Sequence, residues 1–412
     1  MVPNGWKIVN IENIATVKGG RRMPKGRPFA EEVTPYPYIR VSDFKDGSIR
    51  KDNLKYVLPN DREQIKHYTI SSQDIYISIA GTIGLVGTVP RELDGAQLTE
   101  NAAKISIKNP KNIDINFLKY VLSSKFVQNQ IEQAKGIGGG VPKLAIFRIE
   151  KITILLPTIS EQKKIAEILS SLDEAIASTQ AVIDQTRKVK QGLLQQLLTR
   201  GIGHTKFKES AIGKIPVNWE VEELAKVARV IDCKHRTPEY VESGFPVVRP
   251  RDVKEGALDL SGCLRTTKED YEDLIENHCP SVGDIIYSRN ATFGVAAIVE
   301  TNELFTVGQD VCIIVGQLLI GRLLFYLLNS RIIKTQIDKL SAGSTFQRIN
   351  LKDIRRFLVP VIAEDEQKEI AAIADSVTEE IKTLETQLHH LQTIKNGLMQ
   401  DLLTGRVRVT NI

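Results

Sequence analysis

The side chains best suited to chemistry in this sequence are basic and amide groups on loops rich in glycine and proline. The segment 18–29 (KGGRRMPKGRPF) holds five basic residues and no acid, and its glycines and prolines predict a loop. Arg and Lys neutralise phosphates, while Arg on guanine and Asn or Gln on adenine are the usual pairings with base edges. The chemistry indicated is therefore recognition of nucleic acid.

Side chains of these kinds recur at matching loop positions in both halves of the sequence, and that recurrence favours binding. The alternative for any one of them is a solvated surface charge. Arg40 and Arg249 follow apolar strand residues, so their alternative is a structural role. The candidate DNA contacts are Arg21, Arg22, Lys25, Arg27, Arg40, Ser42, Thr82, Lys143, Lys234, His235, Arg236, Arg249, Arg251, Arg289, Asn290, Thr292, Gln347 and Arg348.

Motifs for catalysis or metal binding are missing from the sequence. It contains no Gly-x-x-x-x-Gly-Lys-Ser/Thr phosphate loop, no Gly-x-Ser-x-Gly elbow and no His-Glu-x-x-His helix. The four cysteines all lie in the second half and form no Cys-x-x-Cys pair, which argues against zinc and against a disulfide framework. We therefore expect a binding and assembly protein that is not an enzyme, with no metal and no cofactor of its own.

Length and charge set further bounds. The 412 residues exceed what one core accommodates and suit two to four domains. The net charge of +5 is mild, so a nucleic-acid surface has to be a local patch. No run resembles a signal peptide or an apolar membrane span, so we expect a cytoplasmic protein without a membrane partner.

The elements that must position these loops occur twice. Residues 161–199 and 366–404 align without a gap at an offset of 205, and 16 of the 39 positions are identical. The repeat is too long for a solenoid unit and indicates a duplicated pair of domains. Weaker matches precede each long segment: 2–8 with 215–221, 36–47 with 245–256, 74–84 with 284–294, and 117–131 with 323–337.

The chain therefore reads as a mixed α/β unit, a long helix, a second α/β unit and a second long helix. Short runs bounded by Gly, Asp and Pro predict strands. Residues 115–134 and 318–340 have helical periodicity and lead into glycine-rich breaks at 136–144 and 341–349. Residues 200–218 lack periodicity, which predicts a linker.

Both long segments carry apolar residues at alternating spacings of four and three, which is typical of a coiled-coil seam. If the two helices pack on each other, the connectivity favours an antiparallel pair, about 58 Å long at about 1.5 Å per residue. The alternative is that each packs only on its own domain. The predicted seam residues are Ile165, Leu169, Leu172, Ile176, Ile183, Leu193, Leu197, Ile370, Val377, Ile381, Leu384, Leu388, Leu391, Leu398 and Leu402.

Over its whole length the pattern resembles the specificity (S) subunits of type I restriction–modification systems. One carrier is the helix entry, with Pro157 before Glu161-Gln162-Lys163 and Pro360 before Glu366-Gln367-Lys368. Further carriers are the helix exits Lys190–Thr199 and Lys395–Thr404, and the segment Ile212–Trp219 with its truncated partner Val2–Trp6.

The resemblance implies an α+β fold in which two mixed α/β target recognition domains are joined by two long α-helices forming an antiparallel coiled coil, with pseudo-two-fold symmetry. The implied boundaries are 1–156 for the first recognition domain, 157–200 for the first spacer helix, 201–359 for the linker and second recognition domain, and 360–412 for the second spacer helix and the C-terminal tail.

The resemblance also implies a function. Each recognition domain would read one half of a bipartite site in double-stranded DNA, while the helices fix the gap. Two modification (methyltransferase) subunits with S-adenosylmethionine, and restriction (translocase/nuclease) subunits with ATP and Mg²⁺, would be the partners. None of these cofactors is expected to bind this chain.

Two rival functions remain at this point. One is a structural coiled-coil hairpin that links two protein-binding modules, which would show no salt-dependent affinity for DNA. The other is a nuclease without recognisable motifs, which would cleave DNA with a divalent metal and no partner.

Overall fold

The computed structural model describes residues 2–138, 141–290, 294–341 and 348–409. The chain folds into two compact units, of which unit 1 comprises Met1–Gln180 and Thr386–Ile412 and unit 2 comprises Ala181–Glu385. Both long helices, α6 (Ile159–Arg200) and α12 (Glu364–Leu402), contribute one half to each unit.

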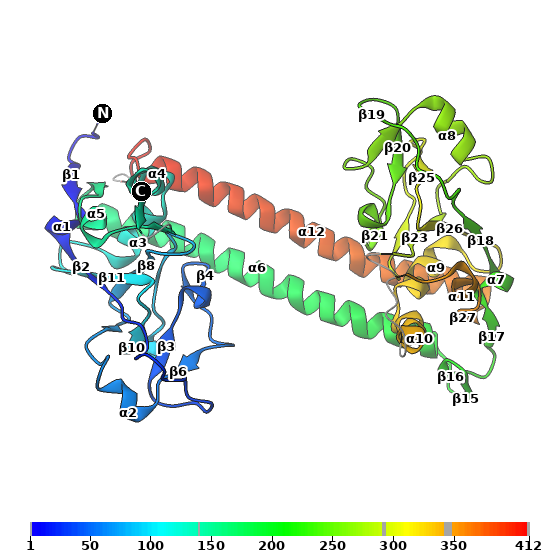
Figure 1. Cartoon of the computed structure of the whole chain (residues 1–412), viewed down its shortest axis with the longest axis horizontal. Coiled ribbons are helices and arrows are strands. Elements are labelled where there is room, and N and C mark those ends of the chain that lie inside the picture. Colours follow the sequence, from blue (N-terminus) through cyan, green and yellow to red (C-terminus); the bar gives the residue numbers. More distant parts are fainter. Residues whose placement is uncertain (1, 139–140, 291–293, 342–347, 410–412) are drawn as a thin grey trace. The chain divides into compact units, whose positions relative to one another are not determined.

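Unit 1 contains an inner and an outer sheet, and the inner one lies nearer the long helices (Figure 1). The inner sheet is antiparallel, in the order β2 (Ala15–Gly19), β11 (Ala102–Ile107), β8 (Asp74–Ser78) and β9 (Val86–Thr88). The outer sheet has the order β6 (Lys55–Tyr56), β3 (Pro37–Ile39), β10 (Ala96–Leu98) and β7 (Thr69–Ile70), with β10 parallel to β3.

The main core of unit 1 lies between the inner sheet, two short helices and the long-helix ends. The short helices are α3 (Ile115–Ser123) and α4 (Lys125–Ala134). Ile75 and Ile105 of the sheet and Phe117 of α3 share this core with Ile165 of α6 and Leu402 of α12. Because strands alternate their faces, the outer sheet buries separate, smaller clusters.

Unit 2 repeats this plan with its own strands. Its inner sheet has the order β18 (Ala228–Asp232), β26 (Val311–Gly316), β23 (Ile285–Ser288), β24 (Ala296–Ile298) and β21 (Gly256–Ala257). Its outer sheet has the order β19 (Tyr240–Val241), β22 (Leu264–Thr266), β20 (Phe245–Val248) and β25 (Thr306–Val307), with β25 parallel to β20. Helices α9 (Gly321–Leu328) and α10 (Arg331–Ser341) cover the inner sheet.

Short elements complete the units. Those of unit 1 are β1 (Lys7–Asn10), paired with β14 (Thr153–Leu156), β4 (Phe44–Lys45) with β5 (Ser48–Ile49), β12 (Gly136–Gly138) with β13 (Val141–Lys143), α1 (Ile11–Ile14), η1 (Val41–Asp43), α2 (Pro59–Arg62), η2 (Arg91–Leu93) and α5 (Ile146–Glu150). Those of unit 2 are β17 (Glu220–Glu223), paired with β27 (Leu358–Val361), β15 (Phe207–Ser210) with β16 (Gly213–Pro216), α7 (Leu224–Val227), η3 (Pro250–Asp252), α8 (Lys268–Leu274) and α11 (Leu351–Arg355).

Three local predictions differ from the structure. The predicted helical segments 115–134 and 318–340 are each two helices; in the first, Ser124 ends α3 and caps α4 by accepting from the Val127 amide. The predicted linker 200–218 contains the β15–β16 hairpin. The glycine-rich break at 136–144 contains the β12–β13 pair, although GIGGG at 136–140 favours a flexible loop; residues 139–140 lie outside the described ranges.

The long helices pack on each other and run antiparallel. In unit 1 the start of α6 shares a core with the end of α12, through Leu169 and Leu402. In unit 2 the end of α6 shares a core with the start of α12, through Leu197 and Ile370. All fifteen predicted seam residues are buried or half-buried. Of the described helices, none combines the length and apolar character that crossing a bilayer requires.

A glutamate near the start of each long helix, buried in unit 1 and half-buried in unit 2, ties that helix to the end of the other. In unit 1 the Glu161 side chain is 2% exposed and accepts hydrogen bonds from Trp6 Nε1 at 3.1 Å and from Arg408, which follows α12, at 2.7 and 3.0 Å. In unit 2 Glu366 accepts from Trp219 Nε1 at 3.0 Å and pairs with His204, which follows α6, at 2.9 Å.

The neighbouring glutamine fixes each long helix to its α/β unit. Gln162 accepts from the Asp114 amide, at the start of α3, and donates to the carbonyls of Asn112 and Pro157. Gln367 makes the equivalent bonds with the Ile320 amide and the carbonyls of Leu318 and Ile362. The repeated Glu-Gln pair is thus a structural joint, because buried polar groups require such partners.

We predict that Glu161→Gln lowers the free energy of unfolding by about 1–3 kcal/mol, because it weakens a buried, charge-assisted set of hydrogen bonds. Chemical denaturation of the full chain measures this. Glu167→Gln is the matched control, since its side chain is 70% exposed in a surface ion pair and should change stability little. Equal effects of the two substitutions would contradict the joint.

We also predict that a circular permutant opened near residue 210, with the original ends joined by a short linker, folds. Arg408 Nη1 donates to the Asn4 carbonyl at 2.8 Å, so the chain's two terminal segments meet in unit 1. In unit 2 the continuous segment from His204 to Trp219 occupies the corresponding place. Circular dichroism and thermal melting check this; an unfolded permutant would contradict it.

Candidate nucleic-acid interface

The loops that leave the inner and outer sheets of unit 1 converge in one cluster. The backbone of Gly20 and Arg21, after β2, bonds to the carbonyls of Ala102 and Leu98 at 2.9 and 2.8 Å. This approach requires glycine, because a Cβ at position 20 would meet the Leu98 and Thr99 carbonyl oxygens at 2.3 and 2.2 Å.

The same cluster includes the loop after β8 and the strand β13. The Ala80 amide donates to the Asn101 carbonyl at 3.3 Å, and Leu144 donates to Ile79 at 2.9 Å. An antiparallel bridge pairs Ala80 with Lys143. The structure therefore brings Arg21 and Lys143, which are far apart in the sequence, onto loops that share the segment 98–102.

Unit 2 builds the equivalent cluster. The Arg289 amide, after β23, donates to the Asp310 carbonyl at 2.9 Å, and Ile349 donates to Arg289 at 2.8 Å. An antiparallel bridge pairs Asn290 with Arg348, as Ala80 pairs with Lys143 in unit 1. Thr292 and Gln347, also candidates, lie outside the described residues.

The basic side chains of the first loop in unit 1 differ in their surroundings. Lys25 is exposed. Arg21 lies over the Tyr68 ring at 5.6 Å, and Arg27 pairs with the buried Asp61 at 3.2 Å. Arg22 donates from Nε to Glu100 at 2.6 Å, although its side chain is 77% exposed.

Tyr38 and Glu100 hold this loop in place through hydrogen bonds. Burial raises the pKa of Tyr38 to about 12, so the phenol stays protonated and donates to the Arg21 carbonyl at 2.8 Å. Burial opposes ionisation of Glu100, but hydrogen bonds from Arg22, a backbone amide and Thr99, together with the Arg22 charge, hold the carboxyl pKa below its usual value. The carboxylate is therefore charged at neutral pH.

Arg40 and Arg249 occupy equivalent structural positions. Each guanidinium forms two hydrogen bonds to the aspartate three residues later, Asp43 or Asp252, inside a capped single turn. These contacts support the alternative that both arginines have a structural role. Near them, Ser42 is exposed, and Arg251 lies 3.8 Å from Asp252 with a side chain that is 69% exposed.

The candidate segment 234–236 of unit 2 is neutralised within the unit. Lys234 contacts Asp273 and Glu276 at 2.6 Å each, and Arg236 contacts Asp270 and Asp273 at 2.6 and 2.8 Å. His235 is exposed and lies 3.1 Å from Asp232. Arg289 is only 4% exposed and pairs with Asp232 at 2.7 Å. Thr82, by contrast, is exposed in the loop after β8.

Two carboxylates in the clusters, Glu100 and Asp310, were not among the residues predicted from the sequence, because only basic and amide groups were considered as DNA contacts. Asp310 pairs with Arg348 at 2.8 Å and accepts from Asn290 Nδ2 at 3.1 Å. The available signal was position: both acids follow the outer-sheet strand that runs parallel to its neighbour, β10 or β25.

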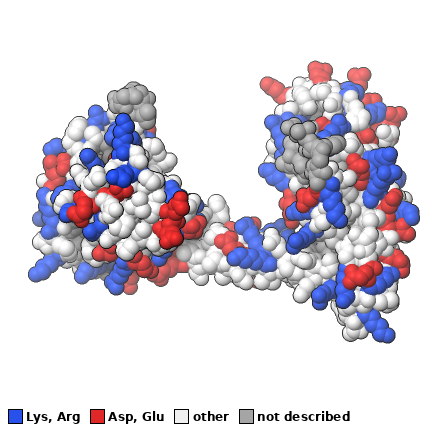
Figure 2. Space-filling model, turned by 60° about the horizontal axis from the view of Figure 1, so that its bottom comes forward, with Lys and Arg blue, Asp and Glu red and all other residues white. Residues whose placement is uncertain are grey.

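Acidic and basic side chains are interspersed over each unit on the face that Figure 2 shows. This agrees with a net charge of only +5. Within the described ranges, no three His, Cys, Asp or Glu side chains are placed to hold a metal ion.

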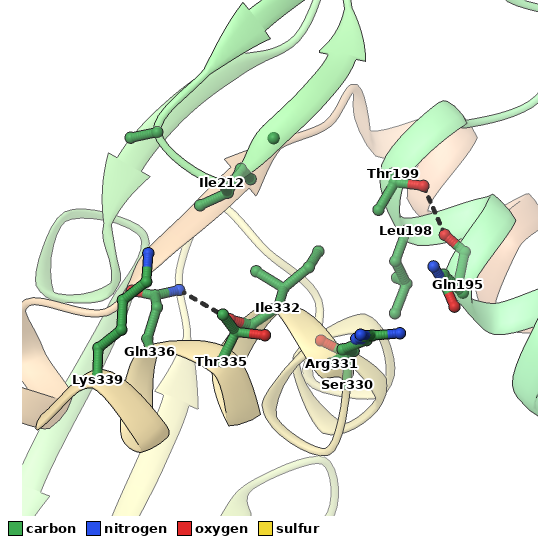
Figure 3. Close-up of a pocket in the computed structure, with 12 residues that line it drawn as sticks. Gln195, Leu198, Thr199, Ile212, Ser330, Arg331, Ile332, Thr335, Gln336 and Lys339 are labelled. Atoms are coloured by element: carbon green, nitrogen blue, oxygen red, sulfur yellow. Dashed lines mark hydrogen bonds between the residues drawn. The ribbon is translucent and has the colours of Figure 1, made fainter. Parts of the chain in front are cut away.

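Each unit also carries a cavity where a long helix ends. In unit 2 a cavity of about 350 Å³ lies between the end of α6, the start of α10 and the β15–β16 hairpin (Figure 3). In unit 1 a cavity of about 530 Å³ lies between the end of α12 and the start of α4. Equivalent residues line both: Gln195 and Gln400, Leu198 and Leu403, Thr199 and Thr404, Ser330 and Ser124, Arg331 and Lys125, Ile332 and Phe126.

The chain matches known proteins along its whole length. It is 28% identical to the type I restriction enzyme MjaVIII specificity subunit of Methanocaldococcus jannaschii, and the alignment covers 100% of this chain and 95% of that protein. The fold is similar to a chain in a solved type I restriction–modification system, with a TM-score of 0.60, 17% identity and 99% and 100% of the two chains covered.

A second solved structure, the type I restriction–modification S subunit from M. genitalium, gives a TM-score of 0.57 at 17% identity and covers 97% of this chain and 96% of that one. The family model described as the type I restriction modification DNA specificity domain matches residues 3–186 and 216–393. With both halves matched, the chain belongs to the type I restriction–modification DNA specificity family, whose members are the non-catalytic specificity subunits of those enzymes.

Proposed function

We propose that each unit reads one half of a bipartite site in double-stranded DNA and that α6 and α12 set the gap between the halves. The observation that carries this proposal is the repeated loop cluster. Each unit contains one, built from the same strand ends, and the same two continuous helices enter both units.

The side chains of the clusters support DNA as the ligand. Lys25, Lys143 and Thr82 are exposed on or beside the unit 1 cluster, where they can reach phosphates. Arg22 in unit 1 and Arg348 with Asn290 in unit 2 are the residue types that read guanine and adenine. The two clusters carry different side chains on the same backbone plan, as two different half-sites would require.

The helices suit the task of a spacer. Helix α6 has 42 residues and α12 has 39, and neither contains an internal proline. Reading two half-sites from one side of the duplex needs readers about one turn, roughly 34–36 Å, apart. A packed pair of helices can keep such a separation better than a flexible linker can.

The partners proposed are two modification subunits, joined by restriction subunits in the cleaving complex. We place the modification subunits at the two cavities where α6 and α12 end. Equivalent residues line both cavities, so one kind of partner can bind twice. Phe126 is 49% exposed and lines the unit 1 cavity together with Met399 and Leu403, so these residues form an apolar wall that a partner can cover.

Methylation mapping tests the proposed function directly. The full chain is expressed with its modification subunits, and the modified positions are read by sequencing. We expect one bipartite motif with a constant gap, and specific DNA binding that weakens steeply with salt. Methylation without a bipartite motif, or no DNA affinity at all, would contradict the proposal and favour a protein scaffold.

Inserting four residues after Gln180 in α6 and four after Glu385 in α12 should lengthen the gap. Four helical residues add about 6 Å, which corresponds to about one to two base pairs. The two half-sites should stay unchanged, because neither loop cluster is touched. Methylation mapping of the variant measures the gap. An unaltered gap would contradict the role of the helices as a spacer.

Phe126→Asp and Ile332→Asp should each reduce the number of bound modification subunits from two to one, and the double variant should bind none. A charge placed in an apolar contact has to be desolvated without a partner. Native mass spectrometry counts the subunits. Phe147→Asp is the matched control, because Phe147 is 61% exposed and lies away from both cavities on α5. Two bound subunits in the double variant would overturn this assignment.

A further inference from the structure

We infer that Glu100 and Asp310 are positioning residues for base recognition, which hold the reading side chains of their own units in place before DNA binds. This inference rests on the proposed function and deepens it. It assigns a role to two acidic residues on a surface where phosphate binding alone would select against negative charge.

Asp310 contacts two side chains of the types that read bases. One carboxylate oxygen pairs with Arg348 Nη2 at 2.8 Å, and the other accepts from Asn290 Nδ2 at 3.1 Å. The Arg348 side chain remains 42% exposed, while that of Asp310 is 23% exposed. The aspartate therefore lies behind the arginine, whose guanidinium carries further donors in a planar fork.

The backbone of Asp310 does not require a carboxylate. Its φ is +64°, in the left-handed region that asparagine and glycine adopt at least as readily as aspartate. Asparagine would therefore satisfy the turn. The turn alone therefore does not explain the carboxylate, whereas its two side-chain partners do.

Unit 1 shows the same arrangement with different residues. Glu100 accepts from Arg22 Nε at 2.6 Å and from Thr99 Oγ1 at 3.0 Å. The Arg22 side chain is 77% exposed and that of Glu100 is 26% exposed, so the arginine again lies outward of its carboxylate. Both acids lie on the loop between the parallel outer-sheet strand and the next inner-sheet strand, β10 to β11 or β25 to β26.

A held arginine discriminates bases better than a mobile one. Fixing its rotamer in the free protein reduces the conformational entropy that binding would otherwise cost. The carboxylate also disfavours contact with an arbitrary phosphate. The two effects together raise the ratio of specific to non-specific binding rather than the affinity for DNA in general.

The test measures that ratio in the complex of the full chain with its modification subunits. Binding is compared between a duplex carrying the mapped motif, duplexes with single base pairs changed in one half-site, and an unrelated duplex. The variants are Asp310→Asn and Glu100→Gln. Glu272→Gln on α8 is the control, since it removes the same charge from a side chain that is 61% exposed.

Asp310→Asn should lower discrimination about fivefold or more at one position of the half-site that unit 2 reads, while binding to the unrelated duplex stays equal or tightens. Glu100→Gln should do the same in the other half-site, and Glu272→Gln in neither. Equal changes for all duplexes, or failure of both variants to fold in thermal melts, would overturn the inference. Absence of any half-site preference in the unsubstituted complex would instead contradict the proposed function.

Discussion

The antiparallel contact between the start of each long helix and the end of the other is the constraint on which the structure depends. Each α/β unit lays its inner sheet and two short helices on such a contact, so neither unit has a complete core without both long helices. Glu161, which is buried, and Glu366, which is half-buried, stabilise these contacts, because each accepts a hydrogen bond from a tryptophan and pairs with a residue that follows the opposite helix. The units can therefore diverge in their outer sheets and loops while the joints stay alike.

The contacts between the short and long helices are of the same kind in both units, even where equivalent positions carry different residues. In unit 1 Tyr120 contacts Ser170 and Asp173, whereas in unit 2 Tyr326 contacts Asp375 and Thr378, so the carboxylate has moved by one helical turn. This shift changes the partners of two equivalent lysines, Lys395 and Lys190. Lys395 lies over the Tyr120 ring at 5.8 Å and Lys190 over the Tyr326 ring at 5.9 Å. Lys395 also pairs with Asp173 at 2.5 Å, whereas Asp375 pairs with Arg322. Burial lowers the pKa of Lys190 accordingly. Packing geometry, more than residue identity, is what the duplication has preserved.

The long helices and the repeat could be predicted from the sequence, because period and identity persist over 39 residues. The joints could not, since nothing local in Glu161-Gln162 reveals a tryptophan 155 residues away in the sequence. Among the candidate contacts, residue type selected Arg22, whose side chain stays 77% exposed beside Glu100. It equally selected Arg40 and Lys234, whose side chains are only 28% and 24% exposed beside their acids. Pairing between distant loops decides which basic groups remain available, and only the fold supplies that information.

The central claim is that the helix pair holds two DNA readers at one separation. Pulsed electron paramagnetic resonance measures this most directly, with spin labels on cysteines at the exposed positions Lys7 and Glu220, which begin β1 and β17, and with the partly exposed Cys263 and the exposed Cys279 replaced by serine. The account predicts a single narrow distribution of distances that is the same with and without DNA carrying the mapped motif. A broad or multiple distribution in the free protein, narrowed only by DNA, would contradict it.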